Sequence, residues 1–144
     1  MSEQEVAAVG AVIEGRMAAI RAGDAARANA MLAPEVVAFE LVPPLALAPG
    51  AARDEAGLAA WLASWDGPVG IEMRDLTIRA SGEVAFAHAL HCLSGTRAGG
   101  RAVRMWLRST LCLEKRDGAW LIVHAHSSVP FRPQDRQVAL DLIP

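Results

Sequence analysis

The chain has 144 residues, 53% of them hydrophobic and 21% charged, with a formal net charge of -2 at pH 7. This length and apolar content suit one core, so we expect a single domain over residues 1–144. The charged residues form no basic stripe, which argues against nucleic acid as a partner. No apolar stretch reaches the roughly 20 residues of a membrane helix, and the N-terminus lacks a basic secretory start, so we expect a cytoplasmic protein without membrane partners.

Two helices and a strand are expected in the first third of the chain. Apolar side chains recur at three- and four-residue spacing over residues 5–21, which predicts an amphipathic helix. Asp24 is a suitable N-cap for a second helix that runs through Leu32 and is closed by Pro34. The β-branched and aromatic residues of 36–42 then predict a strand.

A third helix is expected after Asp54, whose side chain can cap it. One apolar stripe at helical spacing follows, made of Leu58, Trp61, Leu62 and Trp65. A helix docked on a core needs such a stripe, and the two indole rings would equally suit the wall of a pocket for an apolar ligand. Trp61 and Trp65 are therefore candidates both for core packing and for ligand binding.

From Val69 the hydrophobic period changes to two, in four runs separated by turn signals at residues 81–82, 98–100 and 117–118. This pattern predicts a four-stranded antiparallel meander. The alternation slips near Arg74–Asp75, which predicts a bulge that curves the sheet. Three helices on one face of a curved antiparallel sheet make an α+β arrangement.

Strand phase sorts the side chains of residues 103–114 into two faces. The odd positions are apolar apart from Ser109, so we expect them to face the helices. The even positions carry Arg104, Trp106 and Arg108, a mixed aromatic and arginine surface that fits a dimer interface.

The last run adds two histidines to this picture. Strict alternation places Ser127 on one side, and the other side carries Trp120, Ile122, His124 and His126. Histidines at alternate strand positions need a further ligand to hold a metal, and no carboxylate or cysteine cluster is evident nearby. We therefore predict no metal site and assign both histidines to the same interface.

The order helix, Gly23–Asp24, helix, strand, helix and meander resembles the nuclear transport factor 2-like superfamily over nearly the whole chain. The closing segment, residues 117–130, is similar to the end of the calcium/calmodulin-dependent kinase II association domain and to bacterial SnoaL-like proteins. The resemblance implies a cone-shaped, cystatin-like roll with three helices on the concave face of the sheet. Helices and sheet enclose a cavity, and such domains are commonly paired into a dimer through their sheets. Members include isomerases, cyclases, dehydratases, epoxide hydrolases and non-catalytic scaffolds, so the fold leaves the reaction open.

The same resemblance implies site residues. Counted from Gly23–Asp24, Glu40 falls where steroid-isomerase-like members carry a catalytic carboxylate, partly buried; alternatively it points to solvent or pairs with an arginine such as Arg53. Arg16 matches a tyrosine of those isomerases and would pin an anionic ligand, unless it is a solvated helix-face arginine. His91 matches a cavity arginine of the association domain and would donate to a carbonyl or shuttle a proton, unless it is a core histidine.

These residues together predict a homodimer that binds a small, largely apolar organic molecule. The lead hypothesis for its chemistry is an isomerase, dehydratase or hydrolase reaction with Glu40 as base and His91 or Arg16 stabilising negative charge. Ser109 and Ser127 would be polar points on the concave face. No Gly-rich phosphate loop joins a strand to a helix, so no cofactor is expected. The alternative is a non-catalytic association or ligand-binding scaffold.

Overall fold

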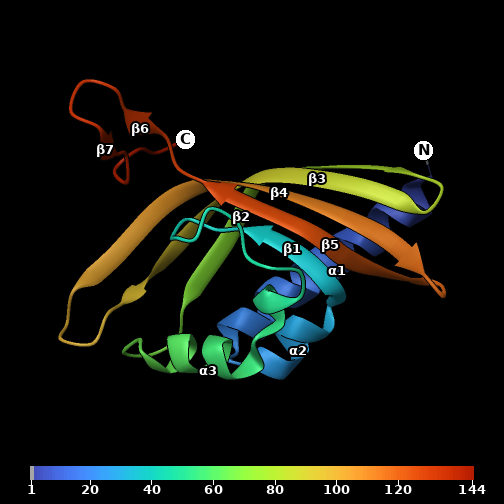
Figure 1. Cartoon of the computed structure of the whole chain (residues 1–144), viewed down its shortest axis with the longest axis horizontal. Helices are drawn as coiled ribbons and strands as arrows, with labels where there is room; N and C mark the ends of the chain where they lie inside the picture. The colour runs from blue at the N-terminus through green and yellow to red at the C-terminus, as the bar shows by residue number, and fades with distance from the viewer. Residues whose placement is uncertain (1) are drawn as a thin grey trace.

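A curved five-stranded sheet with three helices on one side of it makes up most of the molecule (Figure 1). The computed structural model describes residues 2–144. The helices are α1 (Glu3–Arg21), α2 (Ala25–Ala30) and α3 (Glu55–Ala63), with a 3-10 turn, η1, at Ala51–Arg53. The main strands are β1 (Leu32–Phe39), β2 (Gly70–Ser81), β3 (Val84–Thr96), β4 (Ala102–Arg116) and β5 (Ala119–Ser128). These elements confirm the predicted α+β class; none of the helices in the described residues is long and apolar enough to cross a membrane.

The sheet runs in the order β1-β5-β4-β3-β2, and strands β2 to β5 form the predicted antiparallel meander. Strand β1 joins in parallel to β5 at the edge. The register of β2 shifts between Arg74 and Thr77, and Asp75 has a φ of 59°, which confirms the bulge predicted there. Because a bulge increases local bend and twist, it helps the sheet to arch over the helices (Figure 1).

Strand β1 begins at Leu32, four residues before the predicted start, because the chain pairs with β5 directly after α2 ends. The amide of Ile122 donates to the carbonyl of Met31 at 2.9 Å, directly after the helix. Pro34 does not break β1, since an edge strand can spare the N–H that proline lacks. Leu41 and Val42, expected in the strand, lie exposed in the loop that follows it.

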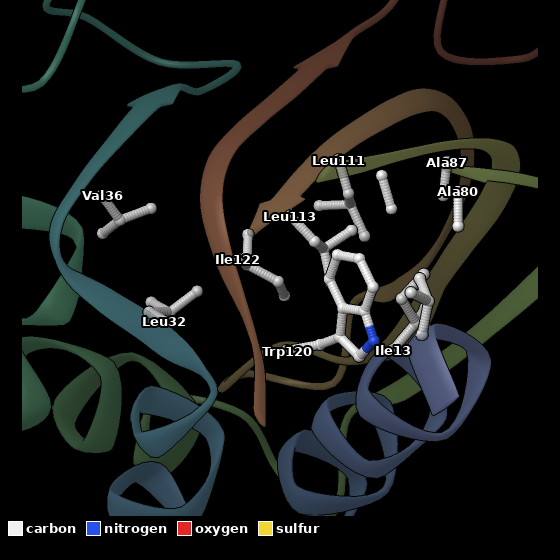
Figure 2. Packing of buried hydrophobic residues seen from close by; sticks show 11 residues of the cluster. Ile13, Leu32, Val36, Ala80, Ala87, Leu111, Leu113, Trp120 and Ile122 are labelled. Carbon is white, nitrogen blue, oxygen red and sulfur yellow. The ribbon is translucent and has the colours of Figure 1, made fainter. Parts of the chain in front are cut away.

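The core lies between α1 and the concave face of the sheet. Its buried side chains come from α1 and all five strands of the main sheet, and the most deeply buried include Ile13, Val36, Leu113 and Ile122 (Figure 2). Strand phase agrees with the prediction, since Ala87 and Ala89 of β3 and Leu107, Ser109 and Leu111 of β4 are also buried. Helix α3 reaches a second cluster, on α1 and α2, through Leu58 and Leu62.

An extra residue in β5 corrects the predicted phase of the last strand. Leu113 pairs with Ile122 and the preceding Cys112 pairs with His124, so Val123 is left without a partner on β4. Side chains on the two sides of this bulge therefore exchange faces.

Trp120 and Ile122 consequently face the core, at 4% and 1% exposure, while His124 and His126 face outward. The prediction that all four share one face is wrong, because strict alternation ignores the bulge.

The bulge also brings Trp120 to a polar partner on α1. Its indole N–H donates to Glu5 Oε2 at 2.8 Å, and Lys115 Nζ donates to Glu5 Oε1 at 2.7 Å. The hydrogen bonds from Lys115 and then Trp120 lower the pKa of the Glu5 carboxyl group below its ordinary value. Glu5 thus ties the first turn of α1 to β4 and β5.

Acid is expected to weaken this tie. Since the folded pKa of Glu5 is below its ordinary value of 4.5, its stabilising effect is complete above that pH and is lost as the pH falls through the folded pKa. In chemical denaturation, Glu5→Gln should therefore be less stable than wild type at neutral pH and should approach wild type as the pH falls below the folded pKa of Glu5. Glu3→Gln, an exposed change on the same helix, is the control; identical pH profiles for the two variants would contradict the expectation.

The C-terminal residues form a short hairpin that projects beyond the sheet (Figure 1), made of β6 (Phe131–Arg132) and β7 (Gln137–Val138). The amide of Ala139 donates to the carbonyl of Pro130 at 2.8 Å and closes it. The last three residues, 142–144, then lie against Trp106 and Arg108, where they enclose a pocket of about 170 Å³.

Candidate functional site

A cavity of about 130 Å³, here called the inner cavity, lies between α1, η1, β1 and the concave face of the sheet. Apolar side chains form most of its wall, among them Leu32, Val36, Leu111, Ile122 and Ala125. Three polar side chains complete it: Arg16 from α1, Glu40 directly after β1, and Ser127 near the end of β5. A few polar groups that converge in an apolar hollow are typical of small-molecule sites.

A wider pocket of about 540 Å³, here called the outer pocket, shares Glu40 and Ser127 with the inner cavity. Leu41 and Leu45 from the loop after β1 and Val138 of the C-terminal hairpin line it. Leu45 is 98% exposed, so this apolar side chain has almost no contacts of its own. Glu40 and Ser127 therefore stand at the junction of the two spaces.

Strand β1 brings Glu40 to the concave side. Ala38 pairs with Ala125 on that side, and Glu40 follows it by two residues. The Glu40 side chain is exposed, so the expected burial of this carboxylate does not occur. The expected alternative partner, Arg53, instead donates to the carbonyl of Asn29 at 3.3 Å. Glu40 is thus a carboxylate at the cavity mouth that takes part in no salt bridge within residues 2–144.

Helix α1 directs Arg16 inward, to the cavity, rather than to solvent. The guanidinium is largely buried, and its Nε has no hydrogen-bond partner. Burial lowers the pKa of the Arg16 guanidinium, while the Glu40 carboxylate acts in the opposite direction. Because arginine stays protonated in proteins, the cavity contains a positive charge without a bonded counter-ion.

Strand β3 places His91 on the same concave face, opposite Met73 on β2 and Leu107 on β4. Its Nδ1 is buried and has no hydrogen-bond partner, unlike that of a core histidine bonded to a backbone carbonyl. Burial lowers the pKa of His91 to about 4, and the charge of Arg16 acts in the same direction. His91 is therefore neutral at physiological pH, and it lies close enough to Arg16 for the positive charge to disfavour protonation of the imidazole.

The neutral state of His91 predicts a pH effect on stability. The unfolded chain binds this proton near the ordinary pKa of 6.5 and the folded chain only near 4. Stability should therefore fall as the pH drops from the higher to the lower value, by up to about 3 kcal/mol from this group alone. Chemical denaturation of wild type and His91→Gln across that range checks it: the variant should lack this part of the dependence. An NMR titration of the His91 ring with a midpoint at the ordinary value would contradict it.

The two serines assigned to the concave face are neighbours across β4 and β5. Ser109 pairs with Ser127 and, on its other side, with Ala89 of β3. Ser109 is 8% exposed, whereas Ser127 lines both the inner cavity and the outer pocket. Of the two, Ser127 is the one that a ligand at the junction would meet.

The two tryptophans lie apart from this site. Helix α3 ends at Ala63, so Trp65 leaves the helical stripe and packs on Gly95 of β3, where an added Cβ would lie 2.9 Å from the indole. The guanidinium of Arg97 covers the Trp65 ring at 4.6 Å. Trp61 is 39% exposed and meets Trp65 edge to face. Neither indole lines the inner cavity or the outer pocket, so the geometry supports a packing role for Trp65.

The residues assigned to a dimer interface lie on the convex face of the sheet. Arg108 Nε donates to Ser128 at 3.1 Å, and Arg104 lies 3.5 Å from Glu72. Trp106 is half-buried beside the C-terminal residues.

The two histidines of this face stand at the edge formed by β1 and β5. His124 Nδ1 lies 2.7 Å from the carbonyl oxygen of Val37, and the Phe39 ring contacts both imidazoles edge-on. In the described part of the chain no three His, Cys, Asp or Glu side chains gather as metal ligands would.

A larger cleft, about 400 Å³, lies elsewhere, between the C-terminal end of α1 and α3. Arg21 is the charged side chain among its lining residues, and it is occupied by an ion pair with Glu14 and a 2.9 Å hydrogen bond to the carbonyl of Ile71. The inner cavity is therefore the candidate site, since Arg16 and Glu40 take part in no salt bridge within residues 2–144.

Sequence reasoning did not identify the outer pocket. One side of it is the ends of β1 and β5, with Phe39, His126 and Ser127; the other side comes from an irregular loop and the C-terminal hairpin, which carry no periodic pattern. The signal in the sequence that could have indicated it is the apolar content of the loop. Leu41, Val42 and Leu45 are exposed there, and exposed apolar side chains close together often mark a binding site.

A family model described as a SnoaL-like domain matches residues 9–132. Among solved structures, a nuclear transport factor 2-like protein of unknown function from Pseudomonas putida is 26% identical, with 100% of this chain and 99% of that chain covered and a TM-score of 0.87. No curated protein matches the chain.

Two more distant structures share the fold. A ketosteroid isomerase-like protein from Erwinia carotovora atroseptica is 19% identical, over 88% of this chain and 97% of that chain, with a TM-score of 0.70. The association domain of calcium/calmodulin-dependent kinase II from C. elegans is 16% identical, over 88% and 96%, with a TM-score of 0.68. The family match spans most of the sequence and the fold agrees with it, so the chain belongs to the SnoaL-like family of the nuclear transport factor 2-like superfamily.

Proposed function

We propose that this protein binds a small, largely apolar organic molecule in the inner cavity and acts on it by cofactor-free acid/base chemistry. The observation that carries this proposal is the meeting of Arg16, Glu40 and Ser127 in an otherwise apolar cavity of about 130 Å³. Abstraction of a proton beside a carbonyl needs a base and a group that stabilises the resulting oxyanion. A carboxylate at the mouth and a buried guanidinium supply both.

In this mechanism the substrate carbonyl points toward Arg16 and its acidic C–H bond toward Glu40. Glu40 accepts the proton, the electron pair of the C–H bond moves into the enolate, and the enolate oxygen lies in the field of Arg16. Neutral His91 lies in the field of Arg16 but does not line the inner cavity, so its ring N–H would assist only a substrate oxygen that reaches past Arg16 toward β3. Return of the proton to another carbon gives an isomerase, and loss of a leaving group gives a dehydratase.

Exchange with solvent deuterium tests this proposal without knowledge of the natural substrate. Cyclohexanone and cyclohexenone in D₂O should lose the NMR signals of their α-protons faster with the protein than without it, since exchange requires only the first proton transfer. Exchange at the uncatalysed rate with ketones that saturate the cavity would contradict the proposed chemistry.

A second candidate role, self-association, is favoured by the convex face of the sheet. Val84 and Phe86 are 59% and 48% exposed there, beside a shallow apolar depression of about 650 Å³. We infer that two copies pair through this face, with Arg104, Trp106, Arg108, His124 and His126 in the interface. Exposed apolar patches of this kind commonly mark contacts between proteins.

Sedimentation velocity checks the pairing. Wild type should sediment as a dimer and Phe86→Glu as a monomer, because the new charge would be buried against apolar surface. Arg27→Glu, an exposed change on α2 on the other side of the molecule, should remain dimeric. A monomeric wild type, or a Phe86→Glu variant that stays dimeric, would contradict the inference.

A further inference from the structure

We propose that the ligand of the inner cavity carries, beside its reacting carbonyl, a carboxylate that binds the same Arg16 guanidinium, and an apolar chain that extends into the outer pocket. This inference rests on the proposed binding function and adds the chemical class of the ligand. The observation behind it is the position of Arg16. Its guanidinium is buried in the inner cavity without a salt bridge to any described residue, and that cavity leads into the largely apolar outer pocket.

The first step is the state of Arg16. A buried charge is costly unless it is paired and hydrogen-bonded. Even the half-exposed Arg116 is held between Glu35 and Glu114. Arg16 has no such partner in residues 2–144, and its Nε is buried without any acceptor.

The second step concerns what can supply the missing acceptor. Glu40 influences Arg16 only through space and remains exposed at the mouth. The buried Nδ1 of His91 also lacks a partner, and His91 lies within the field of Arg16. A planar carboxylate offers two oxygens with several lone pairs, which suits the fork of a guanidinium and leaves acceptor capacity for an imidazole N–H.

The third step concerns the remainder of the ligand. The inner cavity is small, about 130 Å³, and continues at Glu40 and Ser127 into about 540 Å³ of outer pocket. Leu41, Leu45 and Val138 present apolar surface there that the protein itself leaves exposed. A carboxylate at Arg16 therefore directs an alkyl or aryl chain toward these side chains, past Glu40.

Calorimetric titration of butyrate, hexanoate and octanoate, each beside its primary amide, tests the inference on the full-length protein. The acids should bind at least about tenfold more tightly than their amides, as expected for a charge-assisted pair. Affinity should rise about threefold to fourfold with each added methylene that reaches the outer pocket. Val138→Ser should weaken octanoate and leave butyrate unchanged.

Variants of Arg16 assign the preference to this residue. Arg16→Gln should abolish the preference for acid over amide, Arg16→Lys should keep part of it, and the exposed Arg27→Gln should keep all of it. Circular dichroism establishes that each variant is folded, and the comparison of acid with amide on wild type needs no variant at all. Amides that bind wild type as tightly as acids would overturn the carboxylate and leave the proposed function intact. Binding of neither class would overturn both.

Discussion

Leu113→Ala is expected to lower the free energy of unfolding by about 3 to 5 kcal/mol. Leu113 is 1% exposed and lies at the centre of the cluster that Ile13 of α1 forms with Trp120 and Ile122 of β5 (Figure 2). Truncation removes apolar contacts and leaves a cavity that the surrounding strands cannot close, because α1 and the five strands of the sheet fix its walls.

Urea denaturation followed by circular dichroism measures this loss. Leu76→Ala is the matched control, since Leu76 is 41% exposed at the bulge of β2 and should change stability by less than about 1 kcal/mol. Equal losses in the two variants would show that Leu113 does not belong to the principal core.

Glu40→Gln is expected to reduce turnover by about 100-fold to 10,000-fold, the range typical of a lost general base. Glutamine keeps the size of the side chain and its place at the cavity mouth but cannot accept the proton. Stability should change little, because Glu40 is exposed and has no salt bridge in the described chain.

Deuterium exchange of cyclohexenone α-protons provides the measurement. Glu83→Gln, an exposed change in the β2–β3 turn far along the chain from the site, should retain the wild-type rate. His91→Ala should produce a smaller loss, since it removes a donor and not the base. Wild-type exchange rates in both Glu40→Gln and His91→Ala would exclude the proposed mechanism.

The elements that sequence alone predicted well are those in which local and tertiary preferences agree. The turn at Asp117–Gly118 and the alternation of β4 specify a hairpin and its faces without reference to the rest of the chain. The bulge near Asp75 was visible because the apolar pattern itself slips there.

The features that could not be predicted from the sequence depend on contacts between distant segments of the chain. Strand β1 starts at Leu32 because β5 offers it an edge, and propensity alone favours a start at Val36. The bulge at Val123 leaves no trace in the sequence, since both faces of that run are apolar enough to be buried. A tertiary contact, Trp120 with Glu5, makes the inward phase favourable.

In the candidate site too, some residues were predicted from the sequence and others depend on tertiary contacts. Family resemblance pointed to Glu40 and Arg16, which the fold brings to one cavity from positions 24 residues apart in the sequence. The apolar stripe at helical spacing includes Trp65 and makes it a candidate for a ligand wall, but α3 ends two residues earlier and the indole packs on β3. Helix ends depend on local capping, which apolar periodicity does not reveal.

The most direct measurement is the location of a bound ligand by amide chemical shifts in an NMR titration with hexanoate. The largest changes should occur at Arg16, Ala38 and Ser127, which surround the inner cavity. Changes confined to Ala59, Leu62 and Val69 would place the ligand in the cleft between α1 and α3 instead, and would contradict the assignment of the site.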